Sequence, residues 1–462
     1  MFHLAHWKGV LREQLSVKDN GLTVLEASNI SALCRETGYK WRERIWSPTL
    51  TLLTFLQQVL STAKSCRAAV SIALSELVAS GYEGLLPSAD DSPYCQARGR
   101  LPLAVVQKLQ RQTTDALLAS SREASRWCDR IVRIVDGSSV TMPDTPSLQA
   151  VFPQPEGQTA GCGFPTARLV ALFDWWTGAL IDVAVDRLRV HEIHLARRLW
   201  THLNASDVLL GDRLFGSYAD FALLGQRGVD LIARMHGRRK ADYRKGRRLG
   251  PYDRVIRWER PLVCPRGMTV TEFVELPEYL DIRILRIFVE QNGFRSRVID
   301  LTTTLLDPVK FPAEKIADLY RGRWLAETNL RSIKTHLGME TLRGKSPDIV
   351  RKEIAMNAIA YNLIRTLMYE AAIRYRCKLH RLSFTGTMHR ISTWLPLLGV
   401  QESEASSILD ALLESIAVDT VLDRPDRVEP RRVKRRPKGY SLLVRPRAEY
   451  KARKRDIDRD AR

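Results

Sequence analysis

Residues 131–137 read Ile-Val-Arg-Ile-Val-Asp-Gly and mark the point at which the pattern of the chain changes. Before them, residues 48–121 carry apolar side chains at helical spacing, which predicts a set of helices. After them, β-branched runs predict strands at 169–173, 180–185, 208–210 and 229–233, with helices at 191–203 and 218–226. Strands followed by strand–helix alternation are typical of a mixed α/β core.

Residues 237–308 interrupt this alternation. A basic stretch from Arg238 to Arg248 leads into strand-like runs, of which 282–289 and 297–305 flank Gln291-Asn292-Gly293. An Asn-Gly pair between alternating apolar residues is a strong hairpin signal. Helical periodicity returns at Pro312 and continues, with breaks, to about Leu413. We therefore expect a mostly β segment inserted between two parts of one core.

The length of 462 residues exceeds what a single hydrophobic core usually supports, which is about 250–300 residues. We divide the chain into an N-terminal helical domain (1–125), a first core part (126–236), a β insertion (237–308), a second core part (309–400), and a C-terminal helix with a basic tail (401–462). The N-terminal helices suit either binding of a partner or dimerisation.

The charge of the chain predicts a polyanionic partner. The sequence has 72 Lys and Arg against 52 Asp and Glu, a net charge of +20, and nucleic acid is the leading candidate. Residues 424–462 hold 16 basic and 6 acidic residues, half of that net charge. We interpret this tail as a poorly ordered, largely non-specific phosphate-binding segment, with a merely solubilising end as the alternative.

Other classes of protein are excluded by what the sequence lacks. No stretch of about 18 apolar residues is free of charge, so no membrane span is predicted. The first residues do not form a secretory signal. The seven cysteines are scattered and contain no Cys-x-x-Cys pair, which speaks against a disulfide scaffold or a zinc ribbon and favours a reducing, cytoplasmic setting.

Two acids stand at the predicted carboxyl ends of strands. Asp136 follows the run 131–135, and Asp212 follows Asp-Val-Leu-Leu-Gly. An Asp in this position points out of the sheet, where a ligand can reach it. Taken alone, each is more often a turn residue or a helix N-cap.

A third acid belongs to a predicted helix over 318–337. Tyr320, Arg323, Glu327 and Lys334 fall within an arc of roughly 60° on a regular helix, so one face presents a carboxylate between a phenol and two cations. The alternative is a solvated salt-bridge face, because Arg323 and Glu327 are an i,i+4 pair. Three carboxylates on separate elements suit two divalent cations about 3.5–4 Å apart, which assist phosphodiester cleavage.

These residues resemble the DDE transposases of the insertion-sequence-four family, over most of the chain from about Leu50 to Arg447. The family's Tyr-x2-Arg-x3-Glu-x6-Lys signature is met in full at Tyr320, Arg323, Glu327 and Lys334. Further stretches that look like family motifs are 94–102, 136–145, 211–213 and 338–345.

The resemblance implies an RNase-H-like core in which Asp136, Asp212 and Glu327 form the catalytic triad and bind two Mg²⁺ or Mn²⁺ ions. It also implies that Tyr320, Arg323 and Lys334 hold transposon-end DNA. In relatives a Trp of the β insertion stacks on a flipped base, a role open to Trp258, although a core Trp is the commoner case.

We therefore predict a DNA transposase that works by a cut-and-paste route. Water attacks at the terminal inverted repeats of the element, and the released 3′-hydroxyl attacks target DNA, without a nucleotide cofactor. A homodimeric synaptic complex follows from the resemblance. Two alternatives remain open on the sequence: a catalytically inactive DNA-binding protein, such as a transposition inhibitor, and a structure-selective nuclease. Residues 338–345 are not assigned to an ATP site, because they have the wrong glycine spacing and follow a helix.

Overall fold

The computed structural model describes residues 23–42, 44–79, 88–121, 125–265, 267–288, 298–400, 405–422 and 443–450. Two predicted features, the hairpin turn at 291–293 and most of the basic tail, lie outside the described residues. Among the residues described, no helix is both long and apolar enough to cross a membrane.

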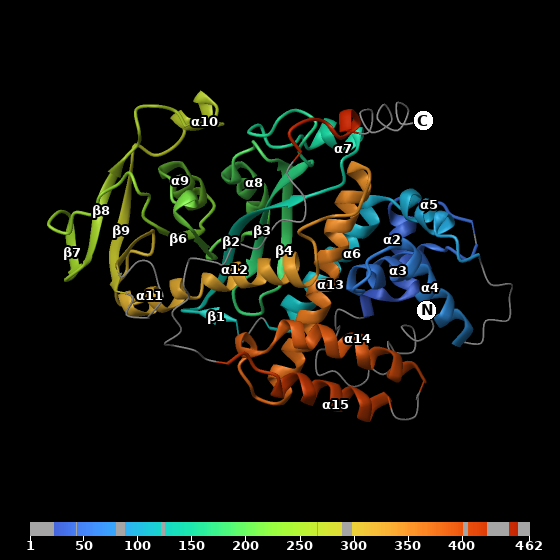
Figure 1. The fold of residues 1–462 in the computed structure, drawn as a ribbon. Coiled ribbons are helices and arrows are strands. Elements are labelled where there is room, and N and C mark those ends of the chain that lie inside the picture. Colours follow the sequence, from blue (N-terminus) through green and yellow to red (C-terminus); the bar gives the residue numbers. More distant parts are fainter. Residues whose placement is uncertain are drawn as a thin grey trace.

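In the described part of the chain, ten strands form one mixed sheet (Figure 1). The strand order is β4-β3-β2-β5-β6-β10-β9-β8-β7, and β1 pairs with β2 outside that path. The strands are β1 Arg126–Trp127, β2 Arg130–Thr141, β3 Thr166–Asp174, β4 Leu180–Arg187, β5 Val208–Gly211, β6 Asp230–Arg234, β7 Arg247–Gly250, β8 Asp253–Glu259, β9 Tyr279–Phe288 and β10 Val298–Thr303.

The first half of the sheet is the RNase-H-like core that the sequence predicted. β3 runs antiparallel to β2 and β4, whereas β2, β5 and β6 run parallel to one another. β2, the first long strand of this core, therefore lies directly beside β5. The α/β fold class is confirmed.

Two hydrophobic cores lie on opposite faces of this sheet, because successive strand residues point to opposite faces. Ile134 of β2 packs in the core formed with α6 (Leu103–Ala119), α12 (Trp324–Arg331) and α13 (Pro347–Arg374). Its neighbour Val135 packs in the core formed with α8 (Glu192–Leu199) and α9 (Tyr218–Gln226).

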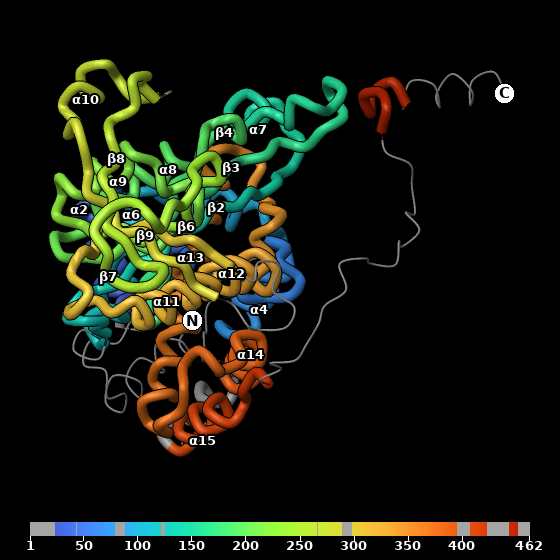
Figure 2. The backbone as a smooth tube through the Cα atoms, turned by 90° about the vertical axis from the view of Figure 1, so that its left-hand side faces the viewer, coloured from blue at the N-terminus to red at the C-terminus, as the bar shows by residue number. Residues whose placement is uncertain are grey.

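The N-terminal helices are α2 Ala27–Glu36, α3 Pro48–Leu60, α4 Cys66–Ala79, α5 Ser92–Arg100 and α6. Three of them, α3, α5 and α6, pack against α13, which is buried for most of its length, and α2 and α4 pack against those helices. At the other end of the chain, α14 (Phe384–Val400) and α15 (Ala405–Val418) lie side by side, away from β7 (Figures 1 and 2). The remaining short helices are α7 Pro146–Val151 and α10 Val270–Val274.

Residues 237–308 continue the sheet instead of forming a second one. β10 pairs antiparallel with β6, and β9, β8 and β7 follow it outward. A buried ion pair joins two of these strands, because the guanidinium of Arg283 on β9 donates to both carboxylate oxygens of Asp253 on β8. The strands expected at 282–289 and 297–305 are thus present as β9 and β10.

The single helix expected over 318–337 is wrong. The segment forms α11 (Ala313–Arg321), α12 and a five-residue π-helix, Ser332–His336. The chain tightens at Gly322 and Arg323, whose amides donate to the carbonyls three residues earlier at 3.0 Å. Gly322 lies so close to Trp175 that a Cβ atom there would come within 2.5 Å of the indole nitrogen. A glycine is therefore required where this helix passes the loop after β3.

Candidate active site

The register of β2 and β5 brings Asp136 next to Asp212. The last Cα pair of this parallel ladder is Ile134 with Leu210. Asp136 comes two residues after Ile134, and Asp212 comes two residues after Leu210. β5 then ends at Gly211, and a 3₁₀-helix begins at Arg213. Both acids therefore lie where the parallel pairing stops, on the α12 face of the sheet.

The prediction that a strand ends at Asp136 is wrong. β2 continues to Thr141, and Asp136 pairs with Ala171 of β3 in the middle of the strand. Only the pairing of β2 with β5 stops before Asp136. The pairing of β2 with β3 continues for five more residues, to Thr141. A carboxylate in mid-strand is more rigidly held than one in a turn, which suits a ligand that must keep its position.

Asp136 is half-buried, and its Oδ1 accepts from the backbone N–H of Gly137 at 3.0 Å. Burial raises the pKa of Asp136 to about 6, and the negative charges of Glu327 and Asp212 act in the same direction. The charge of Arg323 and the Gly137 hydrogen bond oppose this rise in pKa. Glu327 and Asp212 are thus both close enough to Asp136 to affect its pKa.

Asp212 also has the helix-capping role that the sequence left open. Its Oδ1 accepts from the N–H of Leu214 at 2.7 Å, which caps the 3₁₀-helix Arg213–Phe215. Capping and ligand binding are compatible, because a carboxylate has two oxygens and about four acceptor positions. The cap fixes the orientation of this side chain beside Asp136.

Glu327 lies in the first turn of α12, and its carboxylate accepts from Arg323 Nη2 at 2.6 Å. The Arg323 side chain is 17% exposed and that of Glu327 48% exposed. Arg323 therefore provides an internal positive charge between Asp136 and Glu327. The ion pair expected between Arg323 and Glu327 is therefore present, and it lies next to Asp136.

Lys334 and Tyr320 contact the two acid-bearing strands. Lys334 Nζ donates to Ser138 Oγ at 2.8 Å, and Ser138 lies on the same face of β2 as Asp136. The Tyr320 hydroxyl donates to the carbonyl of Gly211 at 3.3 Å, directly before Asp212. Tyr320 is only 7% exposed. Thus the signature residues surround the two acids even though they do not share one regular helix.

The site is wider than a single-ion cluster. Within the described ranges, only Cys66, Asp91 and Cys95 have three potential ligand atoms all within 4.8 Å of one another. A site for two ions about 3.5–4 Å apart needs its carboxylates spread around both ions. Oxygen ligands with net negative charge are also what Mg²⁺ and Mn²⁺ prefer, so the residues present fit these ions.

Two further motifs that the sequence singled out both hydrogen-bond to side chains of α13. In stretch 94–102, the backbone carbonyls of Arg98 and Gly99 accept from the ammonium group of Lys352 on α13. In stretch 338–345, the amide of Gly344 donates to the carboxylate of Glu353 at 2.8 Å. Burial raises the pKa of Glu353. Sequence reasoning recognised these motifs without assigning them this structural role.

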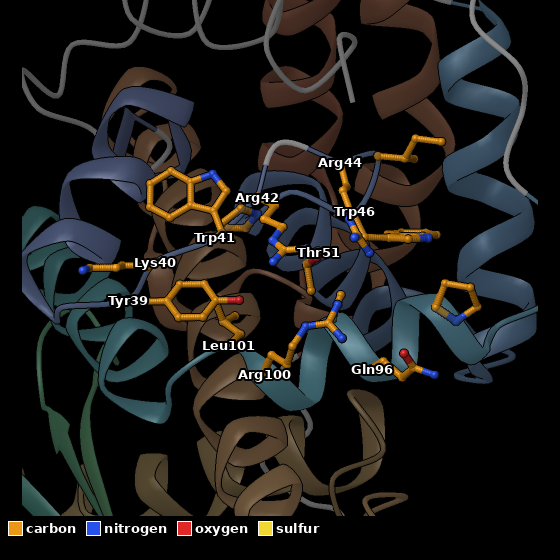
Figure 3. A pocket seen from close by; sticks show the side chains of 14 residues that line it. Tyr39, Lys40, Trp41, Arg42, Arg44, Trp46, Thr51, Gln96, Arg100 and Leu101 are labelled. Carbon is orange, nitrogen blue, oxygen red and sulfur yellow. The ribbon is translucent and has the colours of Figure 1, made fainter.

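A groove in the N-terminal helical region was not predicted (Figure 3). It has a volume of about 750 Å³ and is open to solvent. Its described lining combines aromatic with basic side chains and includes no acid: Tyr39, Trp41, Trp46, Lys40, Arg42, Arg44 and Arg100. The signal that could have revealed it is the alternation of aromatic and basic residues in Tyr-Lys-Trp-Arg-Glu-Arg-Ile-Trp, residues 39–46.

Trp258, for which base stacking was one option, is a structural residue. Trp258 is 5% exposed and packs edge-to-face on Phe221 with ring centroids 5.6 Å apart. The guanidinium of Arg239 covers its ring at 3.8 Å. The core interpretation of Trp258 is confirmed.

Comparisons with known proteins point to one family. Residues 127–363 match the family described as Transposase DDE domain. The transposase InsG for insertion sequence element IS4 of Escherichia coli (strain K12) is 25% identical over 364 residues, covering 77% of this chain and 79% of that protein. The probable transposase for insertion sequence element IS5377 of Geobacillus stearothermophilus is 23% identical, covering 77% of this chain and 85% of that protein.

Among solved structures, the chain is similar to a piggyBac transposase synaptic complex with hairpin DNA determined by cryo-EM. The TM-score is 0.44 at 10% identity, over 88% of this chain and 86% of that chain. The family match spans more than half of the 462 residues and includes all three acids of the site. The protein therefore belongs to the family of transposases with a DDE domain.

Proposed function

We propose that this transposase cuts DNA at the ends of an element and joins the released ends to target DNA at the site formed by Asp136, Asp212 and Glu327. The observation that carries the proposal is the register of β2 and β5, which places Asp136 beside Asp212 on the face covered by α12. The effect of the charges of Glu327 and Asp212 on Asp136 supports the same grouping.

We assign the three carboxylates as ligands of two Mg²⁺ or Mn²⁺ ions. Such ions, when bound, stabilise the charge that develops on the attacking and leaving oxygens of an in-line displacement. The chain itself holds the ligands in place: β2 fixes Asp136, the cap on Leu214 fixes Asp212, and Arg323 orients Glu327. Arg323 also balances the excess negative charge of the three acids.

The two chemical steps each exchange one P–O bond for another. In the first, a water oxygen attacks the phosphorus at the element's end, and the 3′-oxygen leaves and takes up a proton. In the second, that 3′-hydroxyl attacks a phosphodiester of the target and displaces the target's own 3′-oxygen. Arg323 and Lys334, close to Asp136, are suited to bind the non-bridging phosphate oxygens.

Tyr320 contacts the end of β5, directly before Asp212. The resemblance implies a DNA contact for it, and that contact remains a prediction. Its burial and its hydrogen bond to the Gly211 carbonyl favour a positioning role for the segment that carries Asp212.

We propose that the N-terminal helical region, residues 1–125 in our division of the chain, binds double-stranded DNA through the groove around Trp41 and Arg100. The groove offers aromatic faces and guanidinium groups without a described acid in its lining. A homodimer that holds both terminal repeats and the target in one complex is the assembly we expect.

The test uses the full-length protein with Mg²⁺ and a duplex that carries the terminal repeats flanking its own gene. Wild-type protein should cut this duplex and join it to a plasmid, whereas Asp212→Asn should do neither. Asp318→Asn is the matched control, because Asp318 is an exposed acid that pairs with Arg321 on α11. Cleavage without joining would indicate a nuclease, and binding without cleavage would indicate an inactive DNA-binding protein; either result would overturn the proposal.

A further inference from the structure

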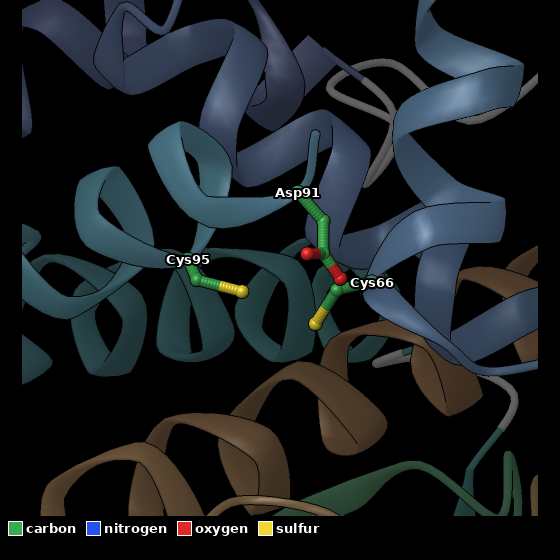
Figure 4. A group of neighbouring side chains, drawn as sticks. All are labelled: Cys66, Asp91 and Cys95. Carbon is green, nitrogen blue, oxygen red and sulfur yellow. The ribbon is translucent and has the colours of Figure 1, made fainter. Parts of the chain in front are cut away.

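A second group of potential ligands lies in the N-terminal helices. Cys66 Sγ, a carboxylate oxygen of Asp91 and Cys95 Sγ all lie within 4.8 Å of one another (Figure 4). Cys66 is the first residue of α4, Asp91 immediately precedes α5, and Cys95 lies one turn into α5. These residues take no part in the chemistry described above.

The donor set matches a zinc-type ion and differs from the transposition site. Zn²⁺ binds thiolate sulfur at about 2.3 Å and carboxylate oxygen at about 2.0–2.2 Å in a tetrahedron, so its ligand atoms stand roughly 3.5–4 Å apart. Two sulfur donors select a thiophilic ion, whereas Mg²⁺ prefers oxygen alone. The observed spacing, with all three ligand atoms within 4.8 Å of one another, is compatible with this geometry.

A buried glutamine orients one of the thiols from a second layer. The Gln58 carbonyl oxygen accepts from Tyr94 Oη at 2.8 Å and from Arg98 Nη1 at 2.9 Å. These two donors fix the amide, so its nitrogen points to Cys66 Sγ at 3.5 Å and to the Lys64 carbonyl at 3.0 Å. An oriented donor to a coordinating sulfur is the usual outer-shell support of a metal site.

The three ligands are half-buried, so an ion can enter from solvent. Three protein ligands leave the fourth position of a tetrahedron to a water molecule. We propose that Cys66, Asp91 and Cys95 bind one Zn²⁺ per chain, which ties the start of α4 to the start of α5. Binding displaces the two thiol protons and forms two S–Zn bonds and one O–Zn bond, with no change of oxidation state.

Such a link has a consequence for the N-terminal groove. Pro93, Gln96, Ala97 and Arg100 of α5 line the groove, and Cys95 lies among them in sequence. An ion at Cys95 would hold α5, and with it one wall of the groove, against α4. The site links two helices and is separate from the proposed Mg²⁺ ligands in both position and donor chemistry.

The experiment uses Co²⁺ as a spectroscopic substitute for Zn²⁺ on full-length, fully reduced protein freed of metal by chelation. Thiolate ligation produces an intense near-ultraviolet charge-transfer absorption, which carboxylates of the transposition site cannot give. We expect one Co²⁺ equivalent per chain with this absorption, and its displacement by Zn²⁺. Cys66→Ser and Cys95→Ser should abolish the absorption, and Asp91→Asn should weaken Zn²⁺ binding at least tenfold.

Cys162→Ser is the matched control, because Cys162 is a half-buried free thiol outside the cluster, and it should bind like the wild type. Circular dichroism of each variant separates loss of the site from loss of folding, and Asp91→Asn is a conservative change that keeps the test decisive. The proposal is overturned if the wild type gives no thiolate absorption or if Cys66→Ser retains it. It is also overturned if mass spectrometry shows a Cys66–Cys95 disulfide in protein purified under reducing conditions.

Discussion

The guanidinium of Arg323 donates to the carboxylate of Glu327 across one helical turn, at 2.6 Å. Arg323 is the more buried partner and also acts on the charge of Asp136. The positive charge of Arg323 thus lies among the acids proposed to bind metal, and it reduces the repulsion between their carboxylates when no metal is bound.

Glu327→Gln should abolish strand cleavage while leaving the fold and end-DNA binding intact. The amide keeps an acceptor for Arg323 but removes an anionic ligand. Because the carboxylate is largely exposed, the free energy of unfolding should change by no more than about 0.5–1 kcal/mol. Cleavage assays with Mg²⁺ and thermal unfolding check both parts. Retained cleavage would remove Glu327 from the triad.

Asp136→Asn should stabilise the metal-free protein at neutral pH while removing its activity. Folding raises the pKa of Asp136 from 3.8 to about 6 through burial, so the fold favours the neutral form. The stability contributed by that form is complete below about pH 4 and is lost as the pH rises through about 6. The neutral amide avoids this loss, which amounts to at most about 3 kcal/mol.

Urea unfolding at pH 4 and pH 7.5, with chelator present, measures this effect. The free energy of unfolding of the variant should exceed that of the wild type at pH 7.5 and match it at pH 4. A variant that is equally destabilised at both values would show that Asp136 carries no unfavourable buried charge.

Lys334→Ala should weaken binding of end DNA, and Ser138→Ala should not. Lys334 reaches Ser138 Oγ at 2.8 Å, so its charge is held near Asp136. Loss of a charged phosphate contact costs about 1.5–3 kcal/mol, or roughly 10–100-fold in affinity. Gel-shift titration of both variants distinguishes phosphate binding by the lysine from a purely structural bond to the serine. An equal loss of DNA affinity in both variants would indicate that the bond between Lys334 and Ser138 is purely structural.

Tyr320→Phe should alter stability more than DNA affinity. The change removes only the hydroxyl that donates to the Gly211 carbonyl, a bond worth about 0.5–1.5 kcal/mol. End-DNA affinity should stay within about threefold of the wild type, because the ring is buried. A loss of more than tenfold, without a change in stability, would instead support the direct DNA contact that the family resemblance implies.

Arg100→Ala should reduce the salt dependence of DNA binding. Each phosphate contact contributes about 0.9 to the slope of log affinity against log salt, so the slope should fall by about one unit. Arg111→Ala is the control, since Arg111 is an exposed arginine of α6 that does not line the groove. Unchanged slopes in both variants would separate the groove from DNA binding.

The core strands were predictable because their signals are local. β-branched runs bounded by Asp, Gly and loop residues located β3, β4, β5 and β6 within three residues at either end. The continuation of β2 beyond Asp136 was not, because Gly137 to Thr141 are held by hydrogen bonds to β3, which is distant in sequence. The close approach of Gly322 to Trp175 was likewise not predictable, because Trp175 is a neighbour only in the folded chain.

By itself, the sequence determined the α/β class, the positions of the three acids and the Tyr-Arg-Glu-Lys signature, since periodicity and motif spacing are properties of a linear chain. Only the tertiary structure decided how these parts meet: the register that joins Asp136 to Asp212, and the packing that brings Cys66 to Asp91 and Cys95. Contacts between residues far apart in sequence depend on strand pairing and on helix packing. Neither is encoded in any one segment, so both were visible only in the fold.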